Sequence, residues 1–143
     1  MASRHFDPEQ FVQAAGDAII AAGADGSIVL WNPAAERVFG YTQSEALGRS
    51  LDLIIPERFR QRHWDGYRQV MHTGHTKYGA DVLRVPAIHK DGRPLSIAFT
   101  VTLLPASGAG GRTIVAIVRD ETTRWNEERE LRRRLADLEA RKT

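Results

Sequence analysis

The chain has 143 residues, of which 42% are hydrophobic and 27% are charged, and its formal net charge is +2. This length suits one domain with a sizeable core, and the composition excludes an intrinsically disordered chain. The small, dispersed charge indicates no nucleic-acid partner, and the absence of cysteine excludes disulfides, thiolate metal sites and cysteine nucleophiles.

Membrane and export signals are also missing from the sequence. The apolar runs are much shorter than a membrane span, and the first ten residues contain no apolar segment of the kind found in secretory signal peptides. We therefore expect a cytoplasmic protein without a membrane partner.

The N-terminal part of the chain predicts a short helix followed by a β-hairpin. Asp7 and Pro8 form a favourable helix start. Two apolar stretches, residues 18–22 and 27–31, flank the turn sequence Asp25-Gly26. Apolar runs around an Asp-Gly turn are typical of two paired antiparallel strands.

Two more short helices are predicted after the hairpin. Asn32-Pro33 begins the first, which ends near Gly40. Thr42 and Glu45 have the spacing of a capping box, and Gly48 closes the second helix after one or two turns.

A longer helix is predicted from Pro56 to a C-cap at Gly74. Its inward stripe carries His63 and three other residues at helical spacing, Phe59, Tyr67 and Val70. A neutral imidazole that faces an apolar pocket is a natural axial ligand for haem iron. The alternative is an ordinary histidine whose ring hydrogen-bonds a backbone carbonyl. Trp64 is expected to cover the sheet edge or to contact a second chain.

The C-terminal half predicts three strands and an exit helix. The strands span residues 77–88, 94–104 and 113–119, and the first two are joined at the turn Asp91-Gly92. From Thr122 onward the chain is helical, with a narrow apolar seam formed by Trp125, Leu131, Leu135 and Leu138. Such a seam with charges of both signs beside it is typical of a coiled coil.

This order of elements predicts an α+β fold. The economical packing is a five-stranded antiparallel sheet with short helices and one longer helix on one face, followed by a C-terminal coiled-coil helix. We divide the chain into an N-terminal helical cap (residues 1–16), a core (17–121) and a signalling or dimerisation helix (122–143). The sequence contains no GxSxG, P-loop, metal triad or recognisable carboxylate pair, so no enzymatic activity is expected.

Five ordered motifs carry a family resemblance. They are residues 25–41, Leu47-Gly48, residues 54–57, Lys90-Asp91-Gly92 and Asp120-Glu121-Thr122. Together, over about residues 8–123, they resemble a PAS sensor domain. The resemblance implies a sensory module of a bacterial-type signalling protein, with Asp120 and Thr122 relaying the signal to the exit helix. It also implies a homodimer through the N-terminal cap and the C-terminal helix, and an output domain such as a histidine kinase or a cyclic-nucleotide enzyme.

The segment from Pro56 to Gly92 is most similar to the haem-bearing PAS domains of FixL-type oxygen sensors. This similarity implies that His63 is the iron ligand of haem b. The other positions that it assigns to the cofactor pocket are Tyr67, Lys77, Tyr78, Leu83, Phe99 and Val101.

Two features depart from the oxygen-sensor pattern. The His-Asp-x-Tyr motif of those sensors becomes His63-Trp64-Asp65-Gly66-Tyr67, which shifts the Asp and the Tyr by one residue. Leu83 stands where those sensors have the distal arginine, and Arg84 beside it is expected on the opposite face of the strand. Without that charge-assisted hydrogen bond, CO, NO or redox sensing is as plausible as oxygen sensing. The remaining alternatives are a haem-free PAS module for dimerisation or signal relay, and binding of a small organic ligand or flavin. Cysteine-adduct photochemistry is excluded because the chain has no cysteine.

Overall fold

A five-stranded antiparallel sheet in the order β2-β1-β5-β4-β3 forms the centre of the molecule. The computed structural model describes residues 5–76, 80–106 and 111–142. Short apolar runs and the turn sequences between them place the strands at β1 (Ala18–Ala22), β2 (Ile28–Trp31), β3 (Leu83–Ile88), β4 (Pro94–Leu104) and β5 (Thr113–Asp120). The sheet architecture predicted from the sequence is confirmed.

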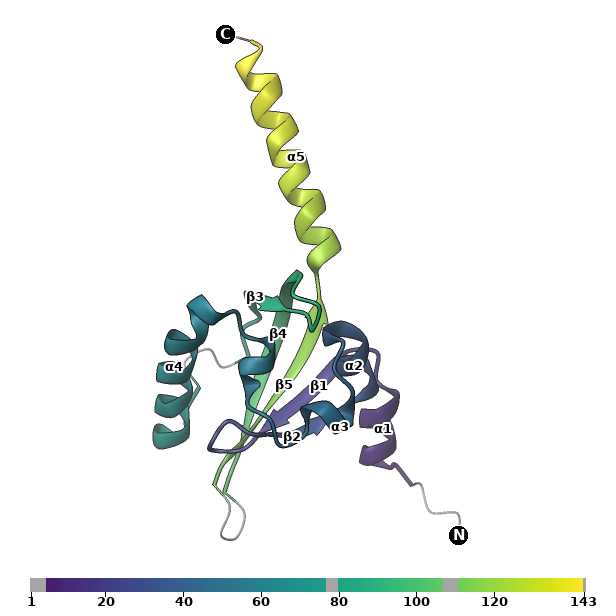
Figure 1. The fold of residues 1–143 in the computed structure, drawn as a ribbon, viewed down its shortest axis with the longest axis vertical. Coiled ribbons are helices and arrows are strands. Elements are labelled where there is room, and N and C mark those ends of the chain that lie inside the picture. The colour runs from purple at the N-terminus through teal and green to yellow at the C-terminus, as the bar shows by residue number, and fades with distance from the viewer. Residues whose placement is uncertain (1–4, 77–79, 107–110, 143) are drawn as a thin grey trace.

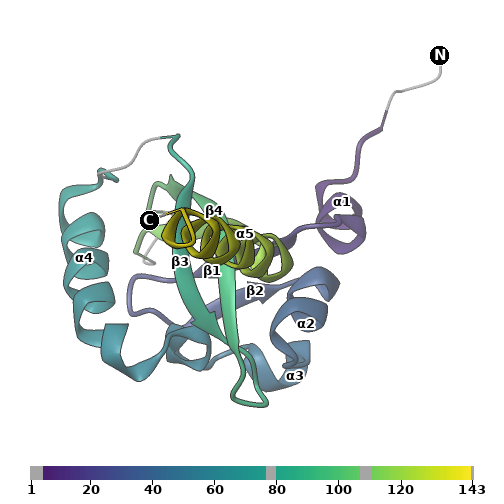
Figure 2. The same ribbon diagram turned by 90° about the horizontal axis from the view of Figure 1, so that it is seen from above.

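Helices lie on one face of this sheet, and one long helix projects away from it (Figure 1). Viewed from above, α1 lies beside α2, and α4 lies at the other side of the domain (Figure 2). The helical elements are α1 (Pro8–Ala14), α2 (Pro33–Phe39), α3 (Gln43–Ala46), η1 (Leu51–Ile54), η2 (Glu57–Phe59), α4 (Arg60–Thr73) and α5 (Thr122–Ala140).

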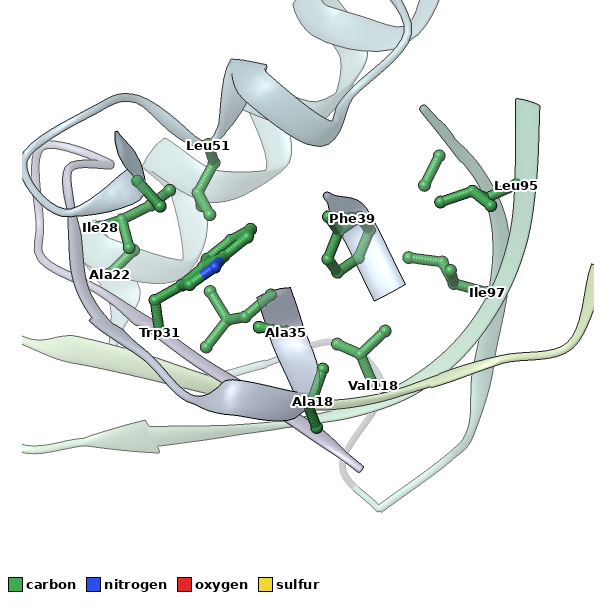
Figure 3. Packing of buried hydrophobic residues seen from close by; sticks show 14 of the residues in the cluster. Ala18, Ala22, Ile28, Trp31, Ala35, Phe39, Leu51, Leu95, Ile97 and Val118 are labelled. Carbon is green, nitrogen blue, oxygen red and sulfur yellow. The ribbon is translucent and has the colours of Figure 1, made fainter. Parts of the chain in front are cut away.

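The hydrophobic core fills the space between these helices and the sheet face that they cover, here called the inner face (Figure 3). Trp31 and Phe39 are fully buried there, with ring centroids 5.6 Å apart. The Trp31 indole N–H donates to the Tyr41 carbonyl at 3.0 Å, which satisfies its one polar atom. Ile97 of β4 and Val118 of β5 close the core from the sheet.

Asn32 is fully buried and holds three elements together. Its side-chain oxygen accepts hydrogen bonds from the backbone N–H groups of Ile19 and Ala35, at 2.9 and 3.0 Å. Its amide nitrogen donates to the carbonyls of Val12 and Asp17. The predicted helix start at Asn32-Pro33 is therefore also the point that ties α1 and β1 to α2.

Two boundaries differ from the sequence-based expectation. The predicted strand 77–88 is wrong at its start, because β3 begins at Leu83 and Ala80 to Val82 lie outside it. Asp81 is a poor strand residue, and β3 is an edge strand with only β4 as its partner. The helix expected from Pro56 begins as the 3-10 turn η2, and regular α-helix starts only at Arg60.

Other turn signals formed as expected. Thr42 and Glu45 make the reciprocal capping box of α3, and Gly40 and Gly74 end α2 and α4 in the left-handed conformation. None of the helices in the described ranges is long and apolar enough to cross a membrane.

Candidate functional site

Helix α4 carries the central residue of the predicted site and meets the core through few side chains. Tyr67 is its one buried residue within the described chain, and Met71 is packed against the core. At its start, the Arg60 guanidinium donates to the Ile55 carbonyl at 3.1 Å. The helix is therefore held mainly by a few side chains rather than by a continuous packed face.

His63 is half-buried on the inward side of α4, as its spacing predicted. Its ring lies 4.7 Å from the Trp64 ring in an edge arrangement and 5.7 Å from the Tyr67 ring, centroid to centroid. Burial lowers the pKa of His63 below its usual range, and the nearby Asp52 carboxylate opposes this shift only in part. The imidazole is therefore neutral at pH 7, the form that can coordinate a metal.

One ring nitrogen of His63 has no internal partner. Its Nδ1 atom is buried, and no other atom in the described ranges hydrogen-bonds to it. Buried polar atoms are normally satisfied, so an orphaned one needs an explanation. Among the described residues, Nδ1 of His63 donates to no backbone carbonyl, so this atom does not make the hydrogen bond expected of an ordinary buried histidine. Elsewhere in the described residues, no group of three His, Asp or Glu side chains could hold a metal ion.

Trp64 and Tyr67 fasten α4 to the β1–β2 turn, a contact that the sequence analysis missed. The Trp64 indole N–H donates to Asp52 Oδ1 at 2.7 Å, and its ring lies where a Cβ on Gly26 would clash with it. The Tyr67 hydroxyl donates to the Gly23 carbonyl. Burial raises the pKa of Tyr67 to about 12. The Tyr67 hydroxyl thus makes a structural bond in this arrangement.

Three predicted pocket residues share the inner face of the sheet. Leu83 of β3 lies directly opposite Phe99 of β4, and Val101 lies opposite Ala116 of β5. All of these side chains are half-buried, and Phe99 packs against the core. The register brings Leu83, Phe99 and Val101 together as an apolar wall.

Arg84 lies on the opposite face, as strand alternation predicted. It pairs with Glu121, with Arg84 Nε 3.5 Å from Glu121 Oε2. Two other predicted pocket residues, Lys77 and Tyr78, lie outside the described residues. The structure thus assembles two partial groups: His63 with Tyr67 on α4, and Leu83, Phe99 and Val101 on the sheet.

An open surface pocket of about 420 Å³ adjoins α4 on the side of the β1–β2 turn. Of the residues assigned to the cofactor, only Tyr67 lines it. The complete lining is Ala24, Asp25, Ser50, Trp64, Tyr67 and Arg68.

The predicted relay residues meet at the end of β5. The Thr122 backbone N–H donates to Asp120 Oδ1 at 2.9 Å, and the Thr122 hydroxyl donates to the same oxygen. The Ser96 N–H of β4 donates to Thr122 Oγ1 at 3.0 Å, and the Glu121 N–H donates to the Ser96 carbonyl at 2.8 Å. The start of α5 is therefore attached to the central sheet and not only to the preceding residue.

Sequence comparison finds bacterial relatives, two of which are named as sensor proteins. The chain is 35% identical over 119 residues to an uncharacterized protein of Azorhizobium caulinodans, covering 82% of this chain and 16% of that protein. It is 26% identical over 105 residues to the oxygen sensor protein DosP of Escherichia coli, covering 73% of this chain and 13% of DosP. It is 43% identical over 51 residues to the sensor protein FixL of Bradyrhizobium diazoefficiens, covering 36% of this chain and 10% of FixL. The chain thus spans less than a fifth of each relative.

Two solved structures share the fold. A PAS domain from Colwellia psychrerythraea superimposes with a TM-score of 0.68 at 19% identity, covering 80% of this chain and 94% of that one. An RNA-binding light-oxygen-voltage receptor gives a TM-score of 0.66 at 22% identity, covering 90% of this chain and 36% of that one. The family model described as the PAS fold matches residues 7–121. The chain belongs to the PAS family.

Proposed function

We propose that this domain is the sensory module of a longer signalling protein, and that it binds haem b through His63 to sense a diatomic gas or a redox state. The observation that carries the proposal is the neutral His63 ring with its unpartnered, buried Nδ1. The partial matches to FixL and to the oxygen sensor DosP support it. The domain itself is proposed to have no enzymatic activity.

The chemistry of the residues in the two partial groups suits such a cofactor. His63 supplies one neutral imidazole, and Leu83, Phe99 and Val101 supply an apolar wall on the inner face. An apolar surface suits the porphyrin ring and excludes water from it. Lys77 is assigned to a propionate and Tyr78 to the distal wall by the resemblance alone. When bound, haem would supply an iron centre that takes up a diatomic gas or an electron.

The distal side of this proposed site lacks a charged donor. Leu83 faces inward, whereas Arg84 is engaged with Glu121 on the other face. A guanidinium that donates to bound oxygen makes a strong, charge-assisted bond, and Leu83 cannot provide one. We therefore propose CO, NO or iron redox state alongside oxygen as the signal.

The proposed output route runs through the sheet. Phe99 lies opposite Val118 of β5, and β5 ends at Asp120, where Thr122 and Ser96 join α5 to the sheet. Repacking at Phe99 would bias the geometry of α5 in a proposed homodimer, and so the activity of an output domain such as a histidine kinase or a cyclic-nucleotide enzyme.

The alternative is a haem-free module that serves dimerisation or relay, or that binds a small organic ligand or flavin. The similarity to a light-oxygen-voltage receptor favours keeping flavin as a candidate. The aromatic lining of the pocket beside α4, with Trp64 and Tyr67, is also compatible with a planar ligand.

Absorption spectroscopy tests the proposal. The purified chain is reconstituted with haem, and we expect a Soret band that His63→Ala abolishes or shifts because the axial ligand is lost. His72→Ala is the matched control, since His72 is on the same helix but exposed. A chain that remains colourless after reconstitution, or equal spectra for both variants, would overturn haem ligation by His63. Flavin absorbance in the purified protein would select the alternative.

A further inference from the structure

Three glycines mark a close junction between the β1–β2 turn, helix α4 and the start of β5. Gly26 lies under the Trp64 ring. A Cβ on Gly74 would lie 2.8 Å from Arg112 Nη2, and a Cβ on Gly111 would lie 2.7 Å from the Ala24 Cβ. The approaches at Gly26 and Gly111 are closer than real Cβ contacts allow. At Gly74 the end of the flexible Arg112 side chain can shift, and the left-handed backbone with a φ of +77° is what favours glycine. Gly26 and Gly74 thus bring α4 close to the β1–β2 turn and to Arg112, and Gly111 brings the start of β5 close to the same turn.

Arg112 is the polar contact of this junction. It is half-buried, immediately precedes β5, and its Nη1 donates to the Met71 carbonyl. Met71 belongs to the last turn of α4, where carbonyls lack partners within the helix and the helix dipole is negative. A guanidinium can donate a hydrogen bond to such a carbonyl and place a positive charge at the negative end of the helix, because it is a permanent cation with several fixed donors. Arg112 thus caps α4 from another element.

The chain continues from Arg112 directly into the output strand. Thr113 begins β5, which pairs with β1 and β4 along its length and ends at Asp120 beside α5. Apart from the hydrogen bond at its C-terminal end, α4 meets the core through Trp64, Tyr67 and Met71. We propose that Arg112 is a coupling residue, which transmits displacement of the C-terminal end of α4 to β5 and so to α5. This proposal requires only that α4 moves and does not depend on haem.

Hydrogen exchange measured by mass spectrometry on the whole chain tests the coupling without a ligand. Gly66→Ala supplies the disturbance, because a Cβ there meets nothing within 4 Å while alanine strengthens the helix. We expect exchange in α4 to slow about fivefold, the effect of a typical Gly-to-Ala change in a helix. With Arg112 present, exchange at the start of β5 should slow as well.

Arg112→Met removes the hydrogen-bond donors of the guanidinium. When Gly66→Ala is combined with Arg112→Met, we expect amide exchange to slow in α4 but not at the start of β5. Arg112→Lys keeps a cation at the helix end and should restore part of the transmission. Arg93→Met, in the β3–β4 turn, is the matched control and should leave transmission unchanged. The proposal is overturned if β5 slows equally in the Arg112→Met background, or if it does not slow when Arg112 is present. Should Arg112→Met fail to fold, Arg112→Leu, which also lacks a donor, carries the same comparison.

Discussion

At the scale of single residues, helical spacing was sufficient to orient His63 but not to reveal what surrounds it. The half-buried ring and its lowered pKa agree with the predicted inward stripe. The contact between Trp64 and Gly26 could not be predicted, because it depends on how α4 meets a turn far away in the sequence. Gly26 was predicted to lie in a turn, where glycine suits the backbone conformation. In the structure, the absence of a side chain on Gly26 also leaves room for Trp64.

A substitution at Gly26 tests this second role. Gly26 has a φ of +83°, and an added Cβ would also meet the Trp64 ring. We expect Gly26→Ala to lower the free energy of unfolding by about 2–4 kcal/mol, which combines left-handed backbone strain with overpacking. Urea denaturation measures this loss.

Gly48→Ala is the control for backbone strain alone. Its φ is +81°, and a Cβ there would meet nothing within 4 Å. We expect a loss of only about 1–2 kcal/mol. Equal losses in the free energy of unfolding for the two variants would mean that the Trp64 ring moves aside without any loss of stability.

At the scale of elements, segments with local start and stop signals were predicted well. The capping box at Thr42 and the C-cap glycines at Gly40 and Gly74 are short-range patterns, and the helices end where these patterns indicate. The start of β3 was predicted wrongly because strand length depends on a partner, and an edge strand has only one. Pro86 within β3 is tolerated for the same reason, since an edge strand need not donate on its open side.

The junction of β5 with α5 yields a prediction for the relay. Thr122→Val keeps the shape of the side chain but removes the hydroxyl that accepts from Ser96 and donates to Asp120. We expect amide exchange in the first turn of α5 to accelerate about tenfold, as for the loss of one or two hydrogen bonds. Thr122→Ser keeps the hydroxyl and should behave much like the unaltered chain. Unchanged exchange in Thr122→Val would show that the hydroxyl does not attach α5 to the sheet.

The exposed leucines of α5 lead to a prediction about assembly. Leu131, Leu135 and Leu138 are 62%, 57% and 55% exposed, and their spacing is that of a coiled-coil seam. We expect the chain to be a dimer whose dissociation constant rises at least about tenfold in Leu135→Gln, because one buried leucine contact is lost. Analytical ultracentrifugation measures the constant.

Ala136→Gln is the matched control for this prediction, since Ala136 is exposed and lies beside the seam. A chain that is monomeric throughout, or equal weakening by both substitutions, would contradict dimerisation through α5. Phe6 and Phe11 near α1, which are 68% and 56% exposed, are the corresponding candidates on the N-terminal cap.

At the scale of the whole molecule, the order of elements was enough to predict the α+β sheet and its helical layer. Packing of an antiparallel sheet under short helices follows from the hairpins and the one-sided apolar pattern. The looseness of α4 was not predictable, because helical spacing indicates which side of a helix faces inward and not how closely it packs. His63 and Tyr67 lie together on α4, and Leu83, Phe99 and Val101 lie together on the inner face of the sheet. That the two groups hold one cofactor stays a prediction.

Global stability should depend on pH through His63. Its folded-state pKa is lowered below the ordinary value of 6.5, so the unfolded chain binds more protons in the window between the two values. The free energy of unfolding therefore falls as pH decreases below about 6.5, and the loss is complete below the folded-state pKa. We expect His63→Gln to flatten this part of the stability curve, as measured by urea denaturation between about pH 7.5 and 5.5.

His72→Gln, which replaces an exposed histidine on the same helix, should keep the pH dependence of the unaltered chain. If His63→Gln retains the full slope, burial of His63 does not govern stability in this range.

The loose seating of α4 also has a consequence for kinetics. A helix held by a few side-chain contacts can detach in a local opening that costs less than unfolding the domain. Such an opening would expose the core side of the sheet, so a ligand of the apolar wall would reach it at a rate set by the opening of α4. Residence time and affinity would in that case be controlled by different residues: the fastenings of α4 for the first, and the apolar wall for the second.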